Sequence, residues 1–286
     1  MKIIKGILNV IFAFLLVIIT FIVLGKNILS NKLLNKNYML NKMEEMQVYL
    51  QISRDVQSGF ENYIYQSGLP EDTINNLYTD EMIRNDTNSI LEYIYDGTEI
   101  KISDDIVRAN LEQKIVSYVE GQNLKLNDQG RKNISDFEDL IVNEYKTNVN
   151  IDEYNSSLQV FPIIHNVVQK LQDINQKIWH LPIIALLIVL FVFILINRKN
   201  LLIAIQYLSI SSLSIGVILK LTVNLVFKNF DIDNIVLFST AMTNLVINII
   251  KEILYSLLDN SNIFVICGIV GIIVSSLLKN ISTNKD

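Results

Sequence analysis

Residues 6–25 form an uninterrupted run of uncharged, mostly apolar residues, and this run constrains the chain more than any other feature. At about 1.5 Å of helical rise per residue, a helix of this length crosses the roughly 30 Å hydrocarbon core of a bilayer. Lys2 and Lys5 precede the run, and basic residues stay on the cytoplasmic side, so the N-terminus is expected inside. The residues that follow are then delivered to the outer face.

A cleaved signal peptide is the alternative interpretation of this run. Its apolar core would be about 7–15 residues long and would end in small residues at a cleavage site. Here the apolar run is longer, and residues 26–30 (Lys-Asn-Ile-Leu-Ser) contain no such pattern. We therefore expect residues 1–28 to remain as an N-terminal transmembrane anchor.

Charge is divided sharply along the sequence. Residues 29–178 contain 24 acidic and 14 basic residues, whereas the rest of the chain contains 5 acidic and 10 basic residues. The acidic segment is predicted to be an extracytoplasmic domain. Its charge disfavours nucleic acid as a partner, because nucleic-acid binding requires clustered cations, and it disfavours tight electrostatic binding to anionic lipid. Cys267 is the only cysteine, so an intramolecular disulfide is excluded.

Residues 179–286 are predicted to be a C-terminal membrane domain with spans at 181–197, 201–227 and 263–278. Arg198 and Lys199 follow the first of these spans and place that turn in the cytoplasm. The polar residues of segment 235–258 recur every three or four positions on one face, which favours an amphipathic helix on the outer surface. The prediction is four spans with both termini inside. Five spans with an exposed C-terminus are the alternative.

Small residues recur at helical spacing in the last two spans. Cys267, Gly271 and Ser275 follow one another at intervals of four, and Ser212 and Gly216 do the same in the preceding span. Such spacing lets helix backbones approach closely in lipid. We predict a seam within the bundle, with homo-oligomerisation as the alternative.

Apolar residues in the extracytoplasmic domain follow helical spacing almost throughout, so this domain is predicted to be mainly helical. Helices are expected to begin at Asp80, Asp104 and Ser135 and to end near Gly97 and Gly121. Short alternating segments at 100–102 and 124–126 could instead pair as a small β-ribbon. The overall fold class is therefore an all-α membrane protein.

A heptad seam leads into the second span. Its apolar residues are spaced alternately by four and three positions: Val160, Ile164, Val167, Leu171, Ile174 and Ile178. Residues 30–66 likewise leave the first span with helical character. We expect the first two spans to continue outward as an antiparallel stalk, and a dimer contact is the alternative use of the seam.

No catalytic, cofactor-binding or metal-binding residues are predicted. His165 and His180 lack the second histidine of a zinc helix, and no nucleophile or phosphate-binding motif occurs. Residues 148–152 resemble the start of a calcium loop, but Glu153 occupies the position that requires glycine. Lys220 in the third span lies within reach of the outer surface, so it is expected to extend its amine there, with a functional role as the alternative.

Adjacent carboxylates are frequent in the acidic segment and are better explained by helix starts than by acid–base chemistry: Glu44-Glu45, Glu71-Asp72, Asp80-Glu81, Asp104-Asp105 and Asp152-Glu153. Tyrosine is also concentrated here, between Tyr38 and Tyr154. Any tyrosine left exposed would suit a protein-binding surface.

Residues 33–40 (LLNKNYML), 62–70 (NYIYQSGLP) and 91–97 (LEYIYDG) resemble an uncharacterised clostridial family of integral membrane proteins, over about the first 120 residues. The resemblance implies this architecture in a Gram-positive cell envelope, without an activity. The layout also resembles FtsX-like permeases, which implies an alternative role as a transporter subunit or regulator coupled to a cytoplasmic ATPase. The sequence departs from them because only five residues precede the first span and the turn at 198–199 is short.

The function predicted from the sequence is non-enzymatic. We expect a multi-pass protein of the cell membrane that presents residues 29–178 outside the cell for sensing, scaffolding or partner binding. The expected partners are the lipid bilayer and other envelope or membrane proteins, and no cofactor is implied.

Overall fold

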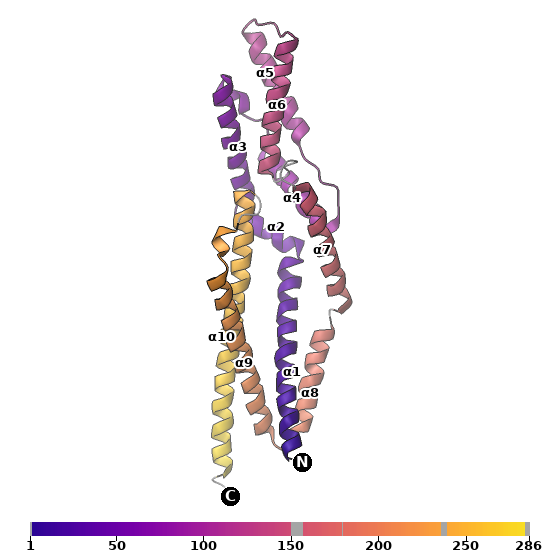
Figure 1. The fold of residues 1–286 in the computed structure, drawn as a ribbon, viewed down its shortest axis with the longest axis vertical. Coiled ribbons are helices and arrows are strands. Elements are labelled where there is room, and N and C mark those ends of the chain that lie inside the picture. Colours follow the sequence, from indigo (N-terminus) through magenta and orange to yellow (C-terminus); the bar gives the residue numbers. More distant parts are fainter. Residues whose placement is uncertain (1, 150–156, 179, 236–238, 284–286) are drawn as a thin grey trace. The chain divides into compact units, whose positions relative to one another are not determined.

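Every regular element among the described residues is a helix (Figure 1). The computed structural model describes residues 2–149, 157–178, 180–235 and 239–283. The predicted all-α class is confirmed for these residues, and the β-ribbon considered for 100–102 and 124–126 does not form. The chain divides into two units, each described by itself. Unit 1 comprises Met1–Lys32, Gln172–Ile235 and Ile247–Asp286, and unit 2 comprises Leu33–Leu171 and Val236–Val246.

Four helical stretches in the described part of the chain are long and apolar enough to cross a membrane: Ile3–Leu33, Val160–Ile196, Leu201–Asn229 and Thr240–Asn280. The second continues from one helix into the next across residue 179, which lies outside the described residues. Large apolar side chains on these stretches are exposed, as Phe14, Phe191 and Ile266 illustrate at 65%, 64% and 60%. Such extensive apolar exposure suits contact with lipid.

Unit 1 is built mainly from long helices. They are α1 (Lys2–Ile28), α8 (Leu181–Ile196), α9 (Leu201–Asn229) and most of α10 (Thr240–Thr283), with a short 3₁₀ turn, η3 (Ile232–Asn234). Asn9 Nδ2 donates to Asn197 Oδ1 at 3.2 Å, and Asn197 Nδ2 donates to Asn9 Oδ1 at 2.8 Å. Both amides are buried, where an unpaired polar group is costly. This reciprocal pair therefore fixes the start of α1 beside the α8–α9 turn.

Small residues bring α9 and α10 into close contact, as the sequence predicts. Ser261 Oγ donates to Gly216 O at 2.8 Å. A Cβ atom added at Gly216 would lie 2.8 Å from Ser261 O, and one added at Gly268 would lie 2.7 Å from Leu213 N. Because these neighbours are backbone atoms, a larger residue at either position would force the helices apart. Cys267, which the sequence placed on the same seam, is exposed instead.

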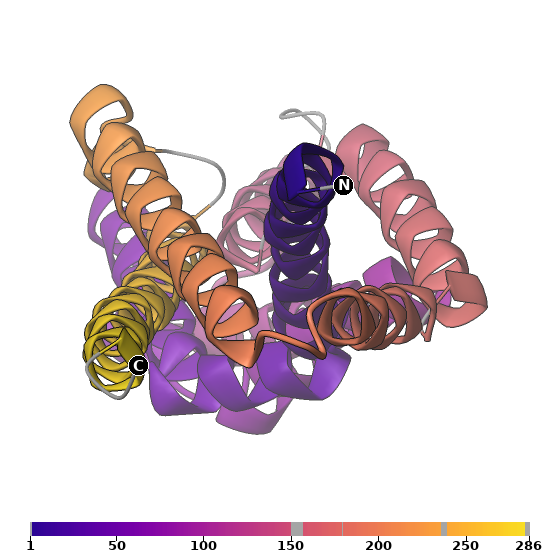
Figure 2. The ribbon, with the colours of Figure 1, turned by 90° about the horizontal axis from the view of Figure 1, so that it is seen from below.

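Three basic segments gather at one end of unit 1 (Figures 1 and 2). The Asn9–Asn197 pair brings the start of α1, with Lys2 and Lys5, to the turn that carries residues 198–199. Helix α10 runs antiparallel to α9, because its later residues contact earlier residues of α9. The C-terminal part of α10, with Lys279, therefore lies at the same end.

The segment predicted as a separate amphipathic helix, 235–258, is instead joined to the last span. Helix α10 continues without a break from Thr240, through the polar residues at 259–262, to Thr283. Those polar side chains bond within the bundle: Asn260 Nδ2 donates to Ser256 O at 2.8 Å, and Ser261 bonds to α9. The apolar face of the first half packs within unit 1, in a cluster of Val223, Ile232, Ile247 and Leu254. Protein packing therefore covers part of this face.

Unit 2 contains shorter helices. They are α2 (Lys36–Glu45), α3 (Val48–Ser67), α4 (Asp80–Asp96), α5 (Asp104–Gly121), α6 (Asp128–Asn148) and the larger part of α7 (Ser157–Ile178), with a 3₁₀ turn, η2 (Glu71–Ile74). The predicted starts at Asp80 and Asp104 and the stop at Gly97 are confirmed. The start at Ser135 is wrong. Helix α6 begins at Asp128, because Asn127 Oδ1 accepts from Gly130 N at 2.7 Å and caps it earlier.

The predicted continuation of the first span through residue 66 is interrupted twice. After α1, the π-turn η1 covers Leu29–Leu33, and α2 begins after Asn35, whose side chain accepts from Tyr38 N at 3.1 Å. Gln47 then adopts the left-handed conformation, with φ of 54°, between α2 and α3, and makes no side-chain capping bond. Residues 30–66 are therefore helical for most of their length, as predicted, but not as one continuous helix.

Helix α7 buries a different face from the predicted heptad seam. Seam residues Val167 and Ile174 are 51% and 52% exposed, whereas Phe161, beside the seam, is 2% exposed and packs on Ile90. On the same face as Phe161, Gln169 Nε2 donates to Tyr95 O at 2.8 Å. The contact to α4 therefore uses a mixed polar face, which apolar periodicity does not reveal.

Candidate functional site

Three hollows border the η2 turn at the end of α3 in unit 2. Their volumes are 860, 670 and 520 Å³. The 860 Å³ hollow lies against the end of α3, and the 520 Å³ hollow lies against α5; Asp72 lines both. These volumes are in the range of small-molecule sites, although the hollows are open and polar. We call the two hollows that share Asp72 the η2 groove.

The local sequence shapes this groove. Gly68, with φ of 72°, ends α3, and Asn76, with φ of 57°, turns the chain toward α4. Between them Ile74 is 2% exposed and anchors the turn in the core. Lys114 of α5 donates from Nζ to Asp72 O at 3.2 Å and also to Asn75 O. The turn is thus fixed on both sides, while its polar side chains remain accessible.

The groove is lined mainly by amide, hydroxyl and carboxylate groups. Four of its amide side chains make no hydrogen bond within the described part of the chain: Asn62, Asn75, Asn76 and Gln113. Tyr65 is 89% exposed beside the larger hollow, and Tyr118 is 36% exposed beside the smaller one. These are the exposed tyrosines that the sequence suggested as a binding surface.

A buried carboxylate in unit 2 connects α4 to the start of α5 and to α6. Asp86 of α4 is 3% exposed and accepts from Ser103 N and Ser103 Oγ, both at 2.8 Å, and from the Tyr145 hydroxyl at 2.7 Å. Burial, reinforced by Asp86, raises the pKa of Tyr145 above its ordinary value, so the phenol stays a donor. This network holds the start of α5 and the last turn of α6 on α4, which is a structural role.

A second buried carboxylate lies between α5 and α6. Arg108 contacts Glu138 at 3.5 Å and Asp139 at 2.5 Å, and Glu138 is 6% exposed. Glu138 Oε1 has no hydrogen-bond partner in the described part of the chain. Burial, together with the charge of Glu112, raises the pKa of Glu138, while Arg108 opposes this shift. Keeping Glu138 ionised in this buried position therefore lowers the free energy of unfolding of the domain.

Replacing Glu138 with glutamine should stabilise the domain at neutral pH. Because the pKa of Glu138 is higher in the folded protein than in the unfolded chain, the folded protein binds this proton more tightly. The proton therefore stabilises the folded state at acidic pH, and this stabilisation is lost as the pH rises through the folded-state pKa. At pH 7 the Glu138→Gln variant should melt above the wild type, and the difference should shrink toward about pH 4. Thermal melts of the full chain across this pH range measure it. A variant that melts lower at pH 7 would show that the Arg108 pair outweighs the burial of charge.

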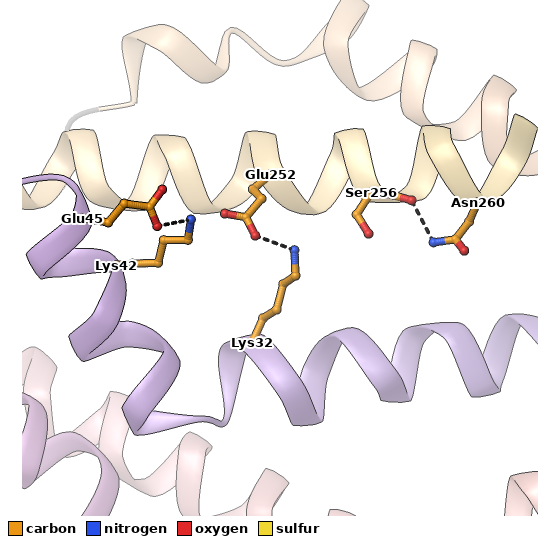
Figure 3. A network of polar contacts seen from close by, with 6 residues as sticks. All are labelled: Lys32, Lys42, Glu45, Glu252, Ser256 and Asn260. Atoms are coloured by element: carbon orange, nitrogen blue, oxygen red, sulfur yellow. Dashed lines mark hydrogen bonds and ion pairs between the residues drawn. The ribbon is translucent and has the colours of Figure 1, made fainter.

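Unit 1 has a partly exposed ion pair at the end opposite its basic segments. Lys32 Nζ lies 2.9 Å from Glu252 Oε1, and the side chains are 19% and 38% exposed (Figure 3). The pair joins η1 to α10. Separately, within unit 2, Lys42 and Glu45 of α2 pair at 2.7 Å. Exposed pairs contribute only about 0–1 kcal/mol. The Lys32–Glu252 pair therefore links two elements of unit 1, the Lys42–Glu45 pair supports one turn of α2, and neither supplies a reaction centre.

The structure describes His165, His180 and Lys220, but only part of the calcium-loop candidate. His165 Nδ1 lies 3.1 Å from Ile94 O, and its ring is 5.4 Å from that of Tyr93. His180 and Lys220 are exposed. Within the described residues, no group of three or more His, Cys, Asp or Glu is arranged to hold a metal ion. Most of the calcium-loop candidate at 148–152, and the pair Asp152-Glu153, lie outside those residues.

Some of the adjacent carboxylates lie at helix starts, but the prediction is wrong for Glu44 and Glu45, which are the last residues of α2. Asp80 and Asp104 lie in the first turns of α4 and α5, as predicted. Glu44 pairs with Arg84, and Asp104 pairs with Lys146 at 2.8 Å. These contacts occupy the acids in structural roles.

Comparison with known proteins found no relationship. No family model matches the chain, and neither curated proteins nor solved structures gave a similar protein.

Proposed function

We propose that this chain is a multi-pass membrane protein that presents unit 2 on the extracytoplasmic side, where the η2 groove binds a partner or ligand. The proposed role is sensing, scaffolding or partner binding, without catalysis. The observation that carries the proposal is the gathering of basic segments at one end of unit 1, described above.

Charge supports this orientation. Lys2, Lys5, Arg198, Lys199 and Lys279 lie at the ends of the apolar helices that meet at that end, and basic residues flanking spans are retained in the cytoplasm. The opposite end of unit 1 carries acidic residues as well, including Asp233 and Glu252. With the basic end inside, the acidic segment 33–171 is outside.

Single-cysteine labelling in intact cells tests the orientation. In a Cys267→Ser background, Glu120→Cys places a thiol on an exposed position of α5, and Asn200→Cys places one in the α8–α9 turn. A membrane-impermeant maleimide should label position 120 in intact cells and position 200 only after permeabilisation. Labelling of position 200 in intact cells, with position 120 protected, would overturn the proposal.

A further inference from the structure

We propose that the η2 groove binds an uncharged, N-acetylated oligosaccharide. This inference rests on the proposed function, because an extracytoplasmic groove meets the glycans of a cell envelope. The lining chemistry, the two exposed tyrosines and the local charge each support it.

The free amides provide the polar recognition. A carboxamide carries two N–H donors and a carbonyl acceptor, so it can pair with an acetamido group through two hydrogen bonds. Asn62 and Asn75 line the 860 Å³ hollow, Gln113 lines the 520 Å³ hollow, and none of these amides bonds within the described part of the chain. A repeating N-acetylated chain presents such a group on each sugar.

The tyrosines provide the flat surfaces. Each hollow has one partly or fully exposed tyrosine at its edge, Tyr65 on α3 and Tyr118 on α5. An exposed phenol ring offers an apolar face for a sugar ring and a hydroxyl at its tip. Since Asp72 lines both hollows, a ligand that extends past Asp72 would meet lining residues of both.

The charge of the groove disfavours anionic polymers. Glu61, Glu71 and Asp72 line it, and Lys114 is its single cation among the lining residues. That amine already donates to two carbonyls of the η2 turn. Phosphate or uronate groups would meet net negative charge, whereas a neutral glycan would not.

A protein partner fits the groove less well. Protein interfaces have a core of aromatic and apolar side chains that pack tightly. Here the large aliphatic lining residues Ile64 and Ile74 are each 2% exposed, because they face the core of unit 2, and only Leu69 is partly exposed. The accessible lining is otherwise polar, with isolated tyrosines.

The test measures oligosaccharide binding to the full chain in lipid nanodiscs, because sugar-headgroup detergents would compete. The probes are chitotetraose, which is N-acetylated; cellotetraose, which lacks acetamido groups; and tetragalacturonate, which is anionic. Chitotetraose should bind best. Tyr65→Ala should weaken its binding about tenfold, and Asn62→Ala severalfold. Asn143→Ala, an exposed helical asparagine on α6 outside the groove, should leave binding unchanged.

Three results would overturn the inference: no saturable binding of chitotetraose at millimolar concentration, equal binding of cellotetraose or tetragalacturonate, or unchanged binding after Tyr65→Ala and Asn62→Ala. Binding by purified protein does not depend on membrane orientation. If chitotetraose does not bind but position 120 is labelled in intact cells, the proposed ligand is wrong and the orientation stands. If chitotetraose binds but the labelling pattern is reversed, the proposed orientation is wrong and the ligand stands.

Discussion

Replacing Gly268 with alanine is expected to lower the free energy of unfolding of unit 1 by about 3 kcal/mol, since overpacking of a tight contact costs this order of energy. The new Cβ would lie 2.7 Å from Leu213 N and 2.8 Å from Ser209 O. Both neighbours are backbone atoms of α9, so no side-chain rotation can relieve the clash, and the two helices must separate. Separation would also weaken the bond from Ser261 to Gly216. Unfolding of the full chain in mixed micelles, followed by loss of helical signal, measures the effect.

Two matched glycine variants make this measurement specific. Gly25→Ala in α1 introduces the same methyl group where no atom lies within 4 Å, so stability should be unchanged or slightly higher. Gly271→Ala would meet only the side chain of Ser209 at close range, and that side chain can turn away. Its effect should be intermediate. Equal effects for Gly268 and Gly25 would contradict the close approach of α9 and α10.

Local signals in the sequence predicted the local structure well. The starts of α4 and α5 follow from acidic residues in their first turns, and Gly97 ends α4 with positive φ, as a glycine at a helix end should. Gly216 and Gly268 pack as the small-residue spacing indicated. The helix starts and the stop at Gly97 depend on residues near one another in the chain, and the small-residue spacing is itself a pattern of four along each helix, so a single sequence contains these signals.

Features set by tertiary packing were not predictable. The apolar periodicity of α7 pointed to Val167 and Ile174, yet α7 contacts α4 through Phe161 and the Gln169 amide. A polar group with a specific backbone partner leaves no periodic signal. Likewise, the sequence separated segment 235–258 from the span 263–278, whereas α10 is continuous and Ser261 bonds to Gly216 O of α9, 45 residues away.

The candidate site was visible only in part. The concentration of tyrosines indicated a binding surface, and the structure leaves Tyr65 exposed. The four free amides were not singled out, because asparagine and glutamine are common throughout this chain. Only the packing of α5 against η2, through Lys114, brings Gln113 near the end of α3.

Replacing Asp86 with alanine should unfold unit 2 more readily than any exposed substitution, by about 4 kcal/mol. The variant would leave Ser103 N, Ser103 Oγ and the Tyr145 hydroxyl without their acceptor in a site where Asp86 is 3% exposed and Tyr145 is fully buried. A buried donor without a partner costs about 1–3 kcal/mol, and three donors share this carboxylate. Hydrogen exchange of the full chain should therefore accelerate in peptides from α4, α5 and α6.

Two further variants, measured by the same hydrogen exchange, distinguish the loss of this network from the loss of a negative charge. Asp105→Ala removes an exposed carboxylate from the first turn of α5 and should cost only about 0.5 kcal/mol. Tyr145→Phe removes one of the three donors and leaves Asp86 with the other two, so it should cost about 1 kcal/mol. Peptides from α9 should keep their protection in all three variants, because α9 belongs to unit 1. If Asp86→Ala matched Asp105→Ala, the carboxylate would not be the acceptor that joins α4, α5 and α6, and apolar packing alone would hold these helices together.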